Sequence, residues 1–95
     1  MLRTPAGRTR LEILRWLKDP AVHFPRTRRT DPTADGVTAR AVAAKLGVRR
    51  RVAENHLRLL AGAGLLRTRR IRHRTYYRRD EARIAEVSRF FEQGW

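Results

Sequence analysis

Cysteine is absent from this 95-residue sequence. Its absence excludes disulfide bonds, thiolate metal sites and thiol redox sensing together. The longest apolar run, Leu59 to Leu66, is far shorter than the roughly 20 residues that a membrane-spanning helix needs. The first eight residues lack the apolar stretch of a secretory signal. We therefore expect a soluble protein of the cytoplasm that has no membrane partner.

Residue patterns typical of enzymes are also missing. The sequence contains no paired carboxylates, no Ser-His-Asp set, no glycine-rich phosphate loop and no metal-ligand spacing. The histidines, His23, His56 and His73, are scattered and have no cysteine or acidic partner at a recognisable interval. His56 falls on an apolar helix face, where packing is a far commoner role than metal ligation. We expect no catalytic activity, no cofactor and no metal site.

What the sequence has in excess is arginine. Lys and Arg number 23 against 9 Asp and Glu, and 21 of the 23 are Arg. Arginine offers a planar fork that matches phosphate oxygens and the edge of guanine. Residues 49–79 hold 11 basic and 1 acidic side chains, whereas residues 80–95 hold 2 and 4. This distribution predicts a polyanionic partner for residues 49–79 and a protein-facing role for the C-terminal segment.

The first half of the chain predicts two helices separated by a long loop. Thr4-Pro5 favours a helix start, with the threonine as N-cap, and Asp19-Pro20 favours its end. Residues 20–36 hold three of the four prolines and show no periodicity, so we expect an irregular loop there. A second helix is expected over residues 38–46, followed by Gly47 in a left-handed turn.

Another helix is predicted directly after that turn; it opens on Arg49-Arg50-Arg51 and stops at Gly62 and Gly64. At about 100° per residue, its side chains separate into an apolar arc and a mostly basic arc. The apolar arc is expected to pack on the preceding helix, and the basic arc to enter a nucleic-acid groove about one helix wide, or else to be an ordinary solvated face. The apolar arc holds Val52, Ala53, His56, Leu60 and Ala63, and the basic arc holds Arg50, Arg51, Glu54, Asn55 and Arg58.

Two β-prone segments, residues 65–70 and 74–78, follow and predict a hairpin. Arginines gather near its tip, where they are expected to reach phosphates or a minor groove. Alternatively, one or two of them only prevent the exposed edge of the sheet from pairing with another strand. A helix-turn-helix followed by such a hairpin is a mostly helical α+β fold, the winged helix-turn-helix. An apolar content of 41% suffices for one core, so we expect residues 1–95 to form a single domain.

The last helix is expected to begin at Asp80-Glu81, because acidic residues stabilise the positive end of a helix. It carries an apolar stripe, with further aromatics beside it that would be a liability if exposed. We therefore predict a homodimer in which the first and last helices pack against their symmetry mates. The predicted interface contains Leu11, Leu14, Ile84, Val87, Phe90, Phe91 and Trp95.

Taken together, several short sequence segments resemble those of the winged-helix repressors of the ArsR/SmtB family. The resemblance implies about five helices with a two-stranded wing, a dimer, an imperfect palindrome as operator, and repression that an inducer relieves. The segments on which the resemblance is based are Arg10-Leu11-Glu12-Ile13-Leu14, Leu46-Gly47-Val48, His56-Leu57-Arg58-Leu59-Leu60, Ala63-Gly64-Leu65-Leu66 and Tyr76-Tyr77-Arg78.

The sequence departs from the family at several positions. Arg49 replaces the usual Ser at the start of the recognition helix, while Glu54 and Asn55 replace the usual Ser/Thr and Arg within it. Arg72 stands where the wing usually turns through glycine, which predicts a wider tip. The family's cysteine pair is absent, and the last helix has no histidine. A small organic inducer, or none, therefore replaces metal sensing in our prediction.

We predict a sequence-specific, dimeric repressor of double-stranded DNA, associated with the nucleoid when bound. Glu54 is expected either to accept a hydrogen bond from cytosine or to be held by neighbouring arginines, and Asn55 to pair with adenine. A winged helix that binds structured RNA or a ribonucleoprotein is the alternative, and a protein-interaction module is a third hypothesis. The predicted DNA contacts are Thr38, Arg40, Arg49, Arg50, Arg51, Glu54, Asn55, Arg58, Arg69, Arg70, Arg72 and Arg74.

Overall fold

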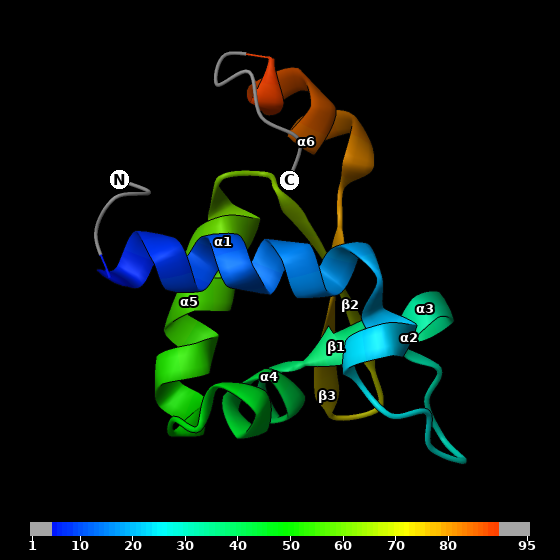
Figure 1. The fold of residues 1–95 in the computed structure, drawn as a ribbon. Helices are drawn as coiled ribbons and strands as arrows, with labels where there is room; N and C mark the ends of the chain where they lie inside the picture. The colour runs from blue at the N-terminus through cyan, green and yellow to red at the C-terminus, as the bar shows by residue number, and fades with distance from the viewer. Residues whose placement is uncertain (1–4, 90–95) are drawn as a thin grey trace.

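Helices pack beside a three-stranded antiparallel sheet in the computed structural model, which describes residues 5–89 (Figure 1). This arrangement confirms the predicted α+β winged helix. Six helices are present in the described range, two of them single turns. The elements are α1 (Pro5–Lys18), α2 (Pro20–His23), α3 (Pro32–Asp35), β1 (Val37–Thr38), α4 (Ala39–Leu46), α5 (Arg50–Gly62), β2 (Leu66–Ile71), β3 (Arg74–Arg79) and α6 (Glu81–Ser88).

The core lies where α1, α4 and α5 meet. Its largest fully buried side chains are Ile13 and Leu14 from α1, Val42 from α4 and Leu57 from α5. Full burial of an aliphatic side chain contributes about 1.5–3 kcal/mol. The three helices are therefore held together mainly by apolar contact, which leaves their polar faces available to solvent or to a ligand.

The helix-turn-helix forms as predicted. The Thr38 hydroxyl accepts a hydrogen bond from the backbone N–H of Ala41 at 3.2 Å and so caps the start of α4. Gly47 ends α4 with φ 71°, in the left-handed region that glycine enters without a side-chain clash. The chain then turns directly into α5 at Arg50.

The buried face of α5 differs from the predicted one. Ala53 and Leu60 are buried as expected, but Val52 is 40% exposed and Ala63 is exposed. Leu57, which the helical projection had assigned to neither arc, is fully buried. The reason is that α5 packs against α1 and β2 as well as α4, so its contact face is turned toward Leu57.

The strand β1 was not predicted. Its two residues pair antiparallel with β3, with Val37 opposite Tyr77 and Thr38 opposite Tyr76. On its other side β3 pairs with β2, with Leu66 opposite Arg79 at the base of the wing. The sheet order is therefore β1-β3-β2. A strand of two residues is too short for an alternating pattern to reveal it.

The irregular loop expected over residues 20–36 is shorter than predicted. Its two ends form the single-turn helices α2 and α3, each with a proline in its first turn. The Asp31 carboxylate caps α3 by accepting from the backbone N–H of Thr33 at 3.0 Å. Residues 24–31 remain as the loop. Its first residue, Phe24, is buried edge-on against Trp16 with ring centroids 6.3 Å apart.

The wing tip is narrower than predicted. Ile71 pairs with Arg74, so the hairpin turns through Arg72 and His73 alone. Arg72 adopts φ 57°. It is the one non-glycine residue of the described range that has a positive φ. Tight two-residue turns need a residue in this region, and arginine serves here in place of the usual glycine or asparagine.

The predicted dimer interface divides into three parts. Leu14 and Ile84 are buried in the core of their own chain, at 1% and 3% exposure, and so offer almost no surface to a second copy. Leu11 and Val87 are half-buried and pack against that core. The N-cap residue Thr4 and the interface residues Phe90, Phe91 and Trp95 lie outside the described residues. The interface stays a prediction.

Gly36 provides a test of the β1–β3 pairing. A Cβ atom at this position would lie 2.7 Å from the Tyr77 carbonyl oxygen, and φ is 95°. We expect Gly36→Ala to lower the free energy of unfolding by about 1–3 kcal/mol, measured by urea denaturation. Gly47→Ala is the matched control, because φ is also positive there but nothing lies within 4 Å of the added carbon. Equal losses in the two variants would contradict the steric role of Gly36.

Candidate nucleic-acid interface

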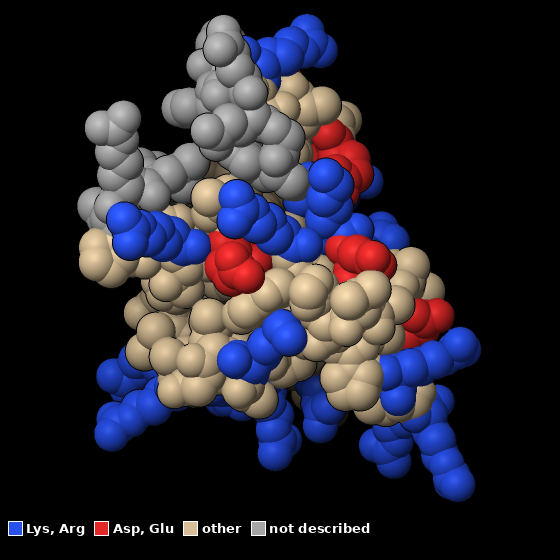
Figure 2. Space-filling model, viewed as in Figure 1, with Lys and Arg blue, Asp and Glu red and all other residues tan. Residues whose placement is uncertain are grey.

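Charge is distributed unevenly over the face shown in Figure 2. Lys and Arg side chains project along its lower edge, below α4 and the wing tip, whereas the visible Asp and Glu side chains lie higher, near α1, α3 and α6. Of the predicted DNA contacts, only Thr38 and Glu54 are half-buried. The exposed ones are Arg40, Arg49, Arg50, Arg51, Asn55, Arg58, Arg69, Arg70, Arg72 and Arg74.

A groove of about 440 Å³ separates α5 from the wing, and we name it the helix–wing groove. Arginines line it from both sides, because Arg40 comes from α4, Arg50 and Arg58 from α5, and Arg74 from β3. Tyr77 also lines it, and burial raises the pKa of its hydroxyl above the ordinary value. The fold thus brings together residues from three elements that had been considered separately in the sequence.

Among the described residues that line this groove, Glu54 is the one acidic residue. Its carboxylate lies 3.2 Å from the Arg50 guanidinium and 3.7 Å from that of Arg58, along one face of α5. Of the two predicted roles for Glu54, the structure shows the pairing with neighbouring arginines; Arg51 takes no part in it. Exposed pairs of this kind contribute only about 0.3–0.5 kcal/mol, so a nucleic acid can compete for both arginines at little cost.

Most of the remaining arginines at this edge carry an uncompensated charge. The other ion pairs within residues 5–89 involve Glu12, Asp80, Glu81 and Glu86, near α1, the base of the wing and α6. Uncompensated guanidinium groups are the groups that phosphate oxygens attract most strongly. In the described range no ion pair involves Arg26, Arg28, Arg29, Arg40, Arg49, Arg51, Arg69, Arg70, Arg72 or Arg74.

The first two turns of α5 expose a mixed surface. Arg51 and Asn55 are exposed as predicted, and Val48 and Val52 are 39% and 40% exposed beside them. Sequence reasoning missed both valines, because it assigned Val52 to the packing face. Guanidinium and amide groups read purine edges, and small apolar side chains contact the thymine methyl group. This end of α5 therefore carries the groups needed to distinguish bases.

Thr38 and Arg40 had been predicted to contact phosphates from the first helix of the motif. The Thr38 hydroxyl already accepts the capping hydrogen bond of α4, while it keeps a proton that can be donated to a phosphate oxygen. Arg40 is exposed and lines the helix–wing groove. Both positions thus remain chemically suited to the predicted role.

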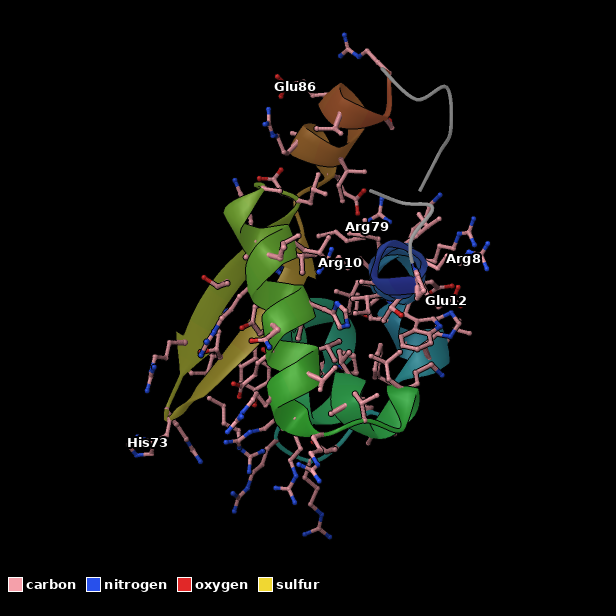
Figure 3. All side chains as sticks on the ribbon, turned by 90° about the vertical axis from the view of Figure 1, so that its left-hand side faces the viewer. Arg8, Arg10, Glu12, His73, Arg79 and Glu86 are labelled. Atoms are coloured by element: carbon pink, nitrogen blue, oxygen red, sulfur yellow. The ribbon has the colours of Figure 1, made fainter. Side chains whose placement is uncertain are left out.

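His56 joins α5 to α1 at the back of the motif. Its Nδ1 accepts a hydrogen bond from the Arg10 guanidinium at 3.2 Å, and Figure 3 shows Arg10 between the two helices. Burial, and then the charge of Arg10, lower the pKa of His56 below its ordinary 6.5. The prediction of a packed histidine is confirmed, although its partner is a side chain. Figure 3 places His73 at the wing tip, at the opposite end of the molecule from Glu86.

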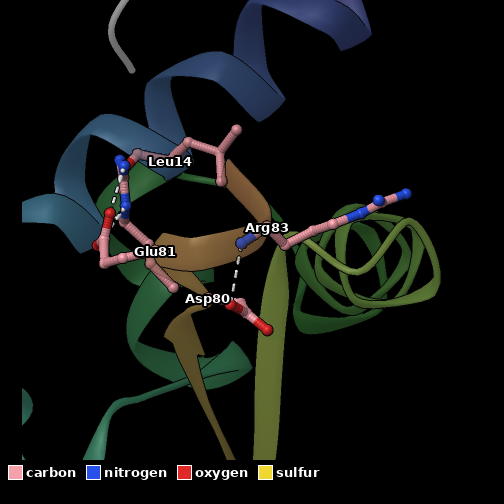
Figure 4. Close-up of polar contacts among 5 residues, drawn as sticks. Leu14, Asp80, Glu81 and Arg83 are labelled. Carbon is pink, nitrogen blue, oxygen red and sulfur yellow. Dashed lines mark hydrogen bonds and ion pairs between the residues drawn. The ribbon is translucent and has the colours of Figure 1, made fainter. Parts of the chain in front are cut away.

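The base of the wing is fastened by Arg79. Its guanidinium donates to both Glu81 carboxylate oxygens, at 2.9 and 3.0 Å, and to the Leu14 carbonyl oxygen of α1 at 2.8 Å (Figure 4). The Arg79 side chain is only 4% exposed, whereas that of Glu81 is 66% exposed, so water reaches the ion pair from the Glu81 side. The next residue, Asp80, accepts from the Arg83 N–H, which lowers the pKa of its carboxyl. The wing therefore leaves a rigid base.

Comparison with known proteins decides the family. The chain is 36% identical, over 87 residues, to the uncharacterized HTH-type transcriptional regulator YbzH of Bacillus subtilis (strain 168), and the match covers 92% of this chain and 87% of that protein. This chain belongs to the helix-turn-helix transcriptional regulators. As a member of that family it is a DNA-binding protein, in agreement with the arginine-rich edge. No protein-family model matches the sequence.

Metal ions and membranes are two other kinds of partner on which the structure of this regulator bears. Within residues 5–89, His, Asp and Glu side chains nowhere gather in a group of three that could hold a metal ion. In the same part of the chain, every helix is too short or too polar to cross a membrane.

The contact of His56 with Arg10 predicts a dependence of stability on pH. Because the pKa of His56 is lower in the folded chain than in the unfolded one, the unfolded state takes up the proton first as the pH falls below 6.5. We expect the free energy of unfolding, measured by urea titration, to decrease from pH 7.5 to 5. His56→Asn, which retains an acceptor without a titrating ring, should flatten this decrease.

His73→Asn is the control for this experiment, because His73 is exposed at the wing tip and lies away from Arg10. Its pH profile should match that of the unmodified protein. An unchanged profile in His56→Asn would show that other groups cause the dependence.

Proposed function

We propose that this regulator is a homodimeric repressor of the cytoplasm that binds a palindromic operator, as its resemblance to the ArsR/SmtB proteins implies. The observation that carries the proposal is the arginine-rich lower edge formed by the start of α5 and the wing tip. The family's cysteine pair is missing from the sequence, so we propose that the repressor does not sense metal. A small organic inducer, or no inducer, takes the place of the metal.

Affinity and specificity are proposed to come from different residues. Exposed arginines at both sides of the helix–wing groove neutralise phosphates and release counterions, which gives affinity that falls with salt. Asn55 and Arg51, near the start of α5, meet base edges in the major groove. Val48 and Val52 lie beside them and favour thymine.

The conformation of Arg72 supports a role for the wing tip. A left-handed backbone costs a residue with a side chain about 1–2 kcal/mol, and glycine would avoid this cost. Strain of this kind is often found at functional positions, where the side chain has a use that offsets it. At the wing tip that use is insertion of a guanidinium into a minor groove, whose negative potential attracts arginine.

The dimer would rest on the surfaces that remain available at the ends of the chain. Leu11 and Val87 keep part of their surface accessible, and the predicted aromatic residues follow α6 in the sequence. A two-fold dimer would present two copies of α5 to half-sites about one helical turn apart or more. The acidic character of residues 80–95 keeps this segment from competing for DNA.

Selection of bound sequences from a random duplex pool, at about 150 mM salt, tests the proposed function. We expect a two-fold-symmetric consensus that competes well against unrelated DNA. Binding without enrichment of any sequence would mean that the arginines hold only the backbone. RNA or architectural binding would then be the better account of this surface.

Asn55→Ala tests whether α5 reads bases. Loss of a bidentate contact to adenine should reduce the difference in binding free energy between operator and non-operator DNA by about 1–3 kcal/mol. The salt slope, which is the slope of the logarithm of the binding constant against the logarithm of the salt concentration, should stay nearly the same. Fluorescence anisotropy with both duplexes measures this difference. Arg69→Ala is the control, because removal of a phosphate contact should weaken both duplexes and lower the slope by about 1. Equal weakening by Asn55→Ala on both duplexes would refute base reading by this residue.

Phe91→Glu tests the proposed dimer. Burying a carboxylate in an apolar interface costs more free energy than the phenylalanine contact contributes. The variant is therefore expected to sediment as a monomer and to lose binding to the full palindrome. Analytical ultracentrifugation measures the mass, with Val22→Glu as the control, since Val22 is 71% exposed in α2. A fully dimeric Phe91→Glu protein would contradict the interface.

A further inference from the structure

The wing has a second basic groove on the side away from α5. We name it the loop–wing groove; it measures about 720 Å³ and lies between the loop 24–31 and the wing tip. Arg28 and Arg29 line it from the loop, and Arg72 and Arg74 line it from the wing. None of the described residues that line it is acidic. The groove is therefore suited to an anion longer than a single small ion.

Its floor is rigid and apolar. Phe24, Val37 and Tyr76 line the groove, and each is at most 5% exposed. Phe24 packs on Trp16 of α1, and the Lys45 ammonium of α4 lies 5.9 Å from its ring centre. The beginning of the loop is thus attached to both α1 and α4, so the loop cannot move away without disturbing the core.

Hydrogen bonds also shape the loop into a closed turn. The Thr27 N–H donates to the Thr30 carbonyl oxygen at 3.0 Å, and the Thr30 N–H donates to the Thr27 hydroxyl at 3.1 Å. Arg28 and Arg29 are the two central residues of this turn, and both are exposed. Their backbone is held by the threonines, which leaves the two guanidinium groups free to contact a ligand.

Neighbouring carboxylates do not neutralise these arginines. Asp31 accepts from the Thr33 N–H at 3.0 Å, and Asp35 accepts from the Asp31 N–H at 2.8 Å. Both acids are therefore used by the backbone of α3. Among residues 5–89, neither Arg28 nor Arg29 forms an ion pair. Such a pair of unpaired arginines in a fixed turn favours phosphate recognition.

The wing tip stands between the two grooves. Along β3, Tyr77 and Thr75 line the helix–wing groove while Tyr76 lines the loop–wing groove, as alternation of a strand requires. Figure 1 shows α5, α4, the wing tip and the loop following one another along the lower edge. A wing that enters a minor groove has a sugar-phosphate strand on each side of it, and that groove is only about 6 Å wide.

We propose that the loop–wing groove holds the sugar-phosphate strand on the far side of the minor groove that the wing enters, with Arg28 and Arg29 on its phosphates. This inference rests on the proposed binding of the wing to DNA. It makes the loop 24–31 a third contact region, in addition to α5 and the wing, and extends the bound DNA beyond the wing in each half-site.

The double variant Arg28→Ala/Arg29→Ala tests the proposal in the full chain. On a duplex extended by about half a turn beyond the wing, the salt slope should fall by about 1 for each arginine per bound chain. The dissociation constant at about 150 mM salt should rise roughly tenfold. On a duplex that ends at the wing contact, the variant and the unmodified protein should bind equally.

Arg8→Ala/Arg15→Ala is the matched control. It removes the same charge from exposed positions of α1, away from both grooves (Figure 3 labels Arg8), and should leave the slope on both duplexes unchanged. Hydroxyl-radical footprinting supplies a second measurement. The Arg28→Ala/Arg29→Ala variant should lose protection only on the strand beyond the wing, while protection over the recognition helix persists.

The outcomes separate the two proposals. Specific binding by the unmodified protein, combined with an unchanged slope and footprint in Arg28→Ala/Arg29→Ala, overturns the role of the loop and leaves the proposed function intact. An equal loss in the control variant on both duplexes shows a general charge effect, which also overturns it. Absence of sequence-specific binding in the unmodified protein contradicts the proposed function itself.

Discussion

Pairing between Thr38 and Tyr76 is the constraint on which the DNA-binding surface depends. Thr38 ends β1 and caps α4, so one residue belongs to both the sheet and the helix-turn-helix. Tyr76 lies in β3, which continues into the wing. The wing and the recognition helix therefore hold a fixed spacing, which binding would otherwise have to establish at a cost in entropy. The tight approach at Gly36 is what allows the short strand to reach β3.

Segregation of charge follows from the same framework. With a net charge of +14, a chain of this size experiences strong self-repulsion, and the ion pairs of the folded chain relieve only part of it. The few acids serve elsewhere: Glu81 binds Arg79 at the base of the wing, and Asp31 and Asp80 cap helices. Apart from Arg50 and Arg58, which pair with Glu54, the arginines at the lower edge are left exposed and without an ion pair within residues 5–89. Folding thus leaves one edge strongly basic, and a polyanion is the partner that relieves its repulsion.

Local chemistry explains which predictions from the sequence were correct. Proline at the start of α1, glycine with a positive φ after α4 and threonine as the α4 cap each act within a few residues, so their effect can be read without knowing the fold. The hairpin was predicted for the same reason. The predicted packing face of α5, which depended on distant contacts, was wrong at Val52, which is exposed, and it omitted Leu57, which is buried. Leu14 and Ile84 lie in the core of their own chain, which no pattern in the sequence had indicated. A helical projection cannot show how many partners a helix has.

The sequence by itself determined the helix-turn-helix, the wing, the excess of arginine and the lack of thiol chemistry, because each depends on residue type and short-range spacing. Tertiary structure alone decided which arginines act together. Residues far apart in the chain, such as Arg28 and Arg72, line one groove, and Arg40 and Arg74 line another. Glu54 pairs with Arg50 and Arg58 on its own helix, which was one of the two local possibilities that the sequence had left open. Such neighbourhoods arise from the burial of the core and the register of β3, and neither leaves a local pattern in the sequence.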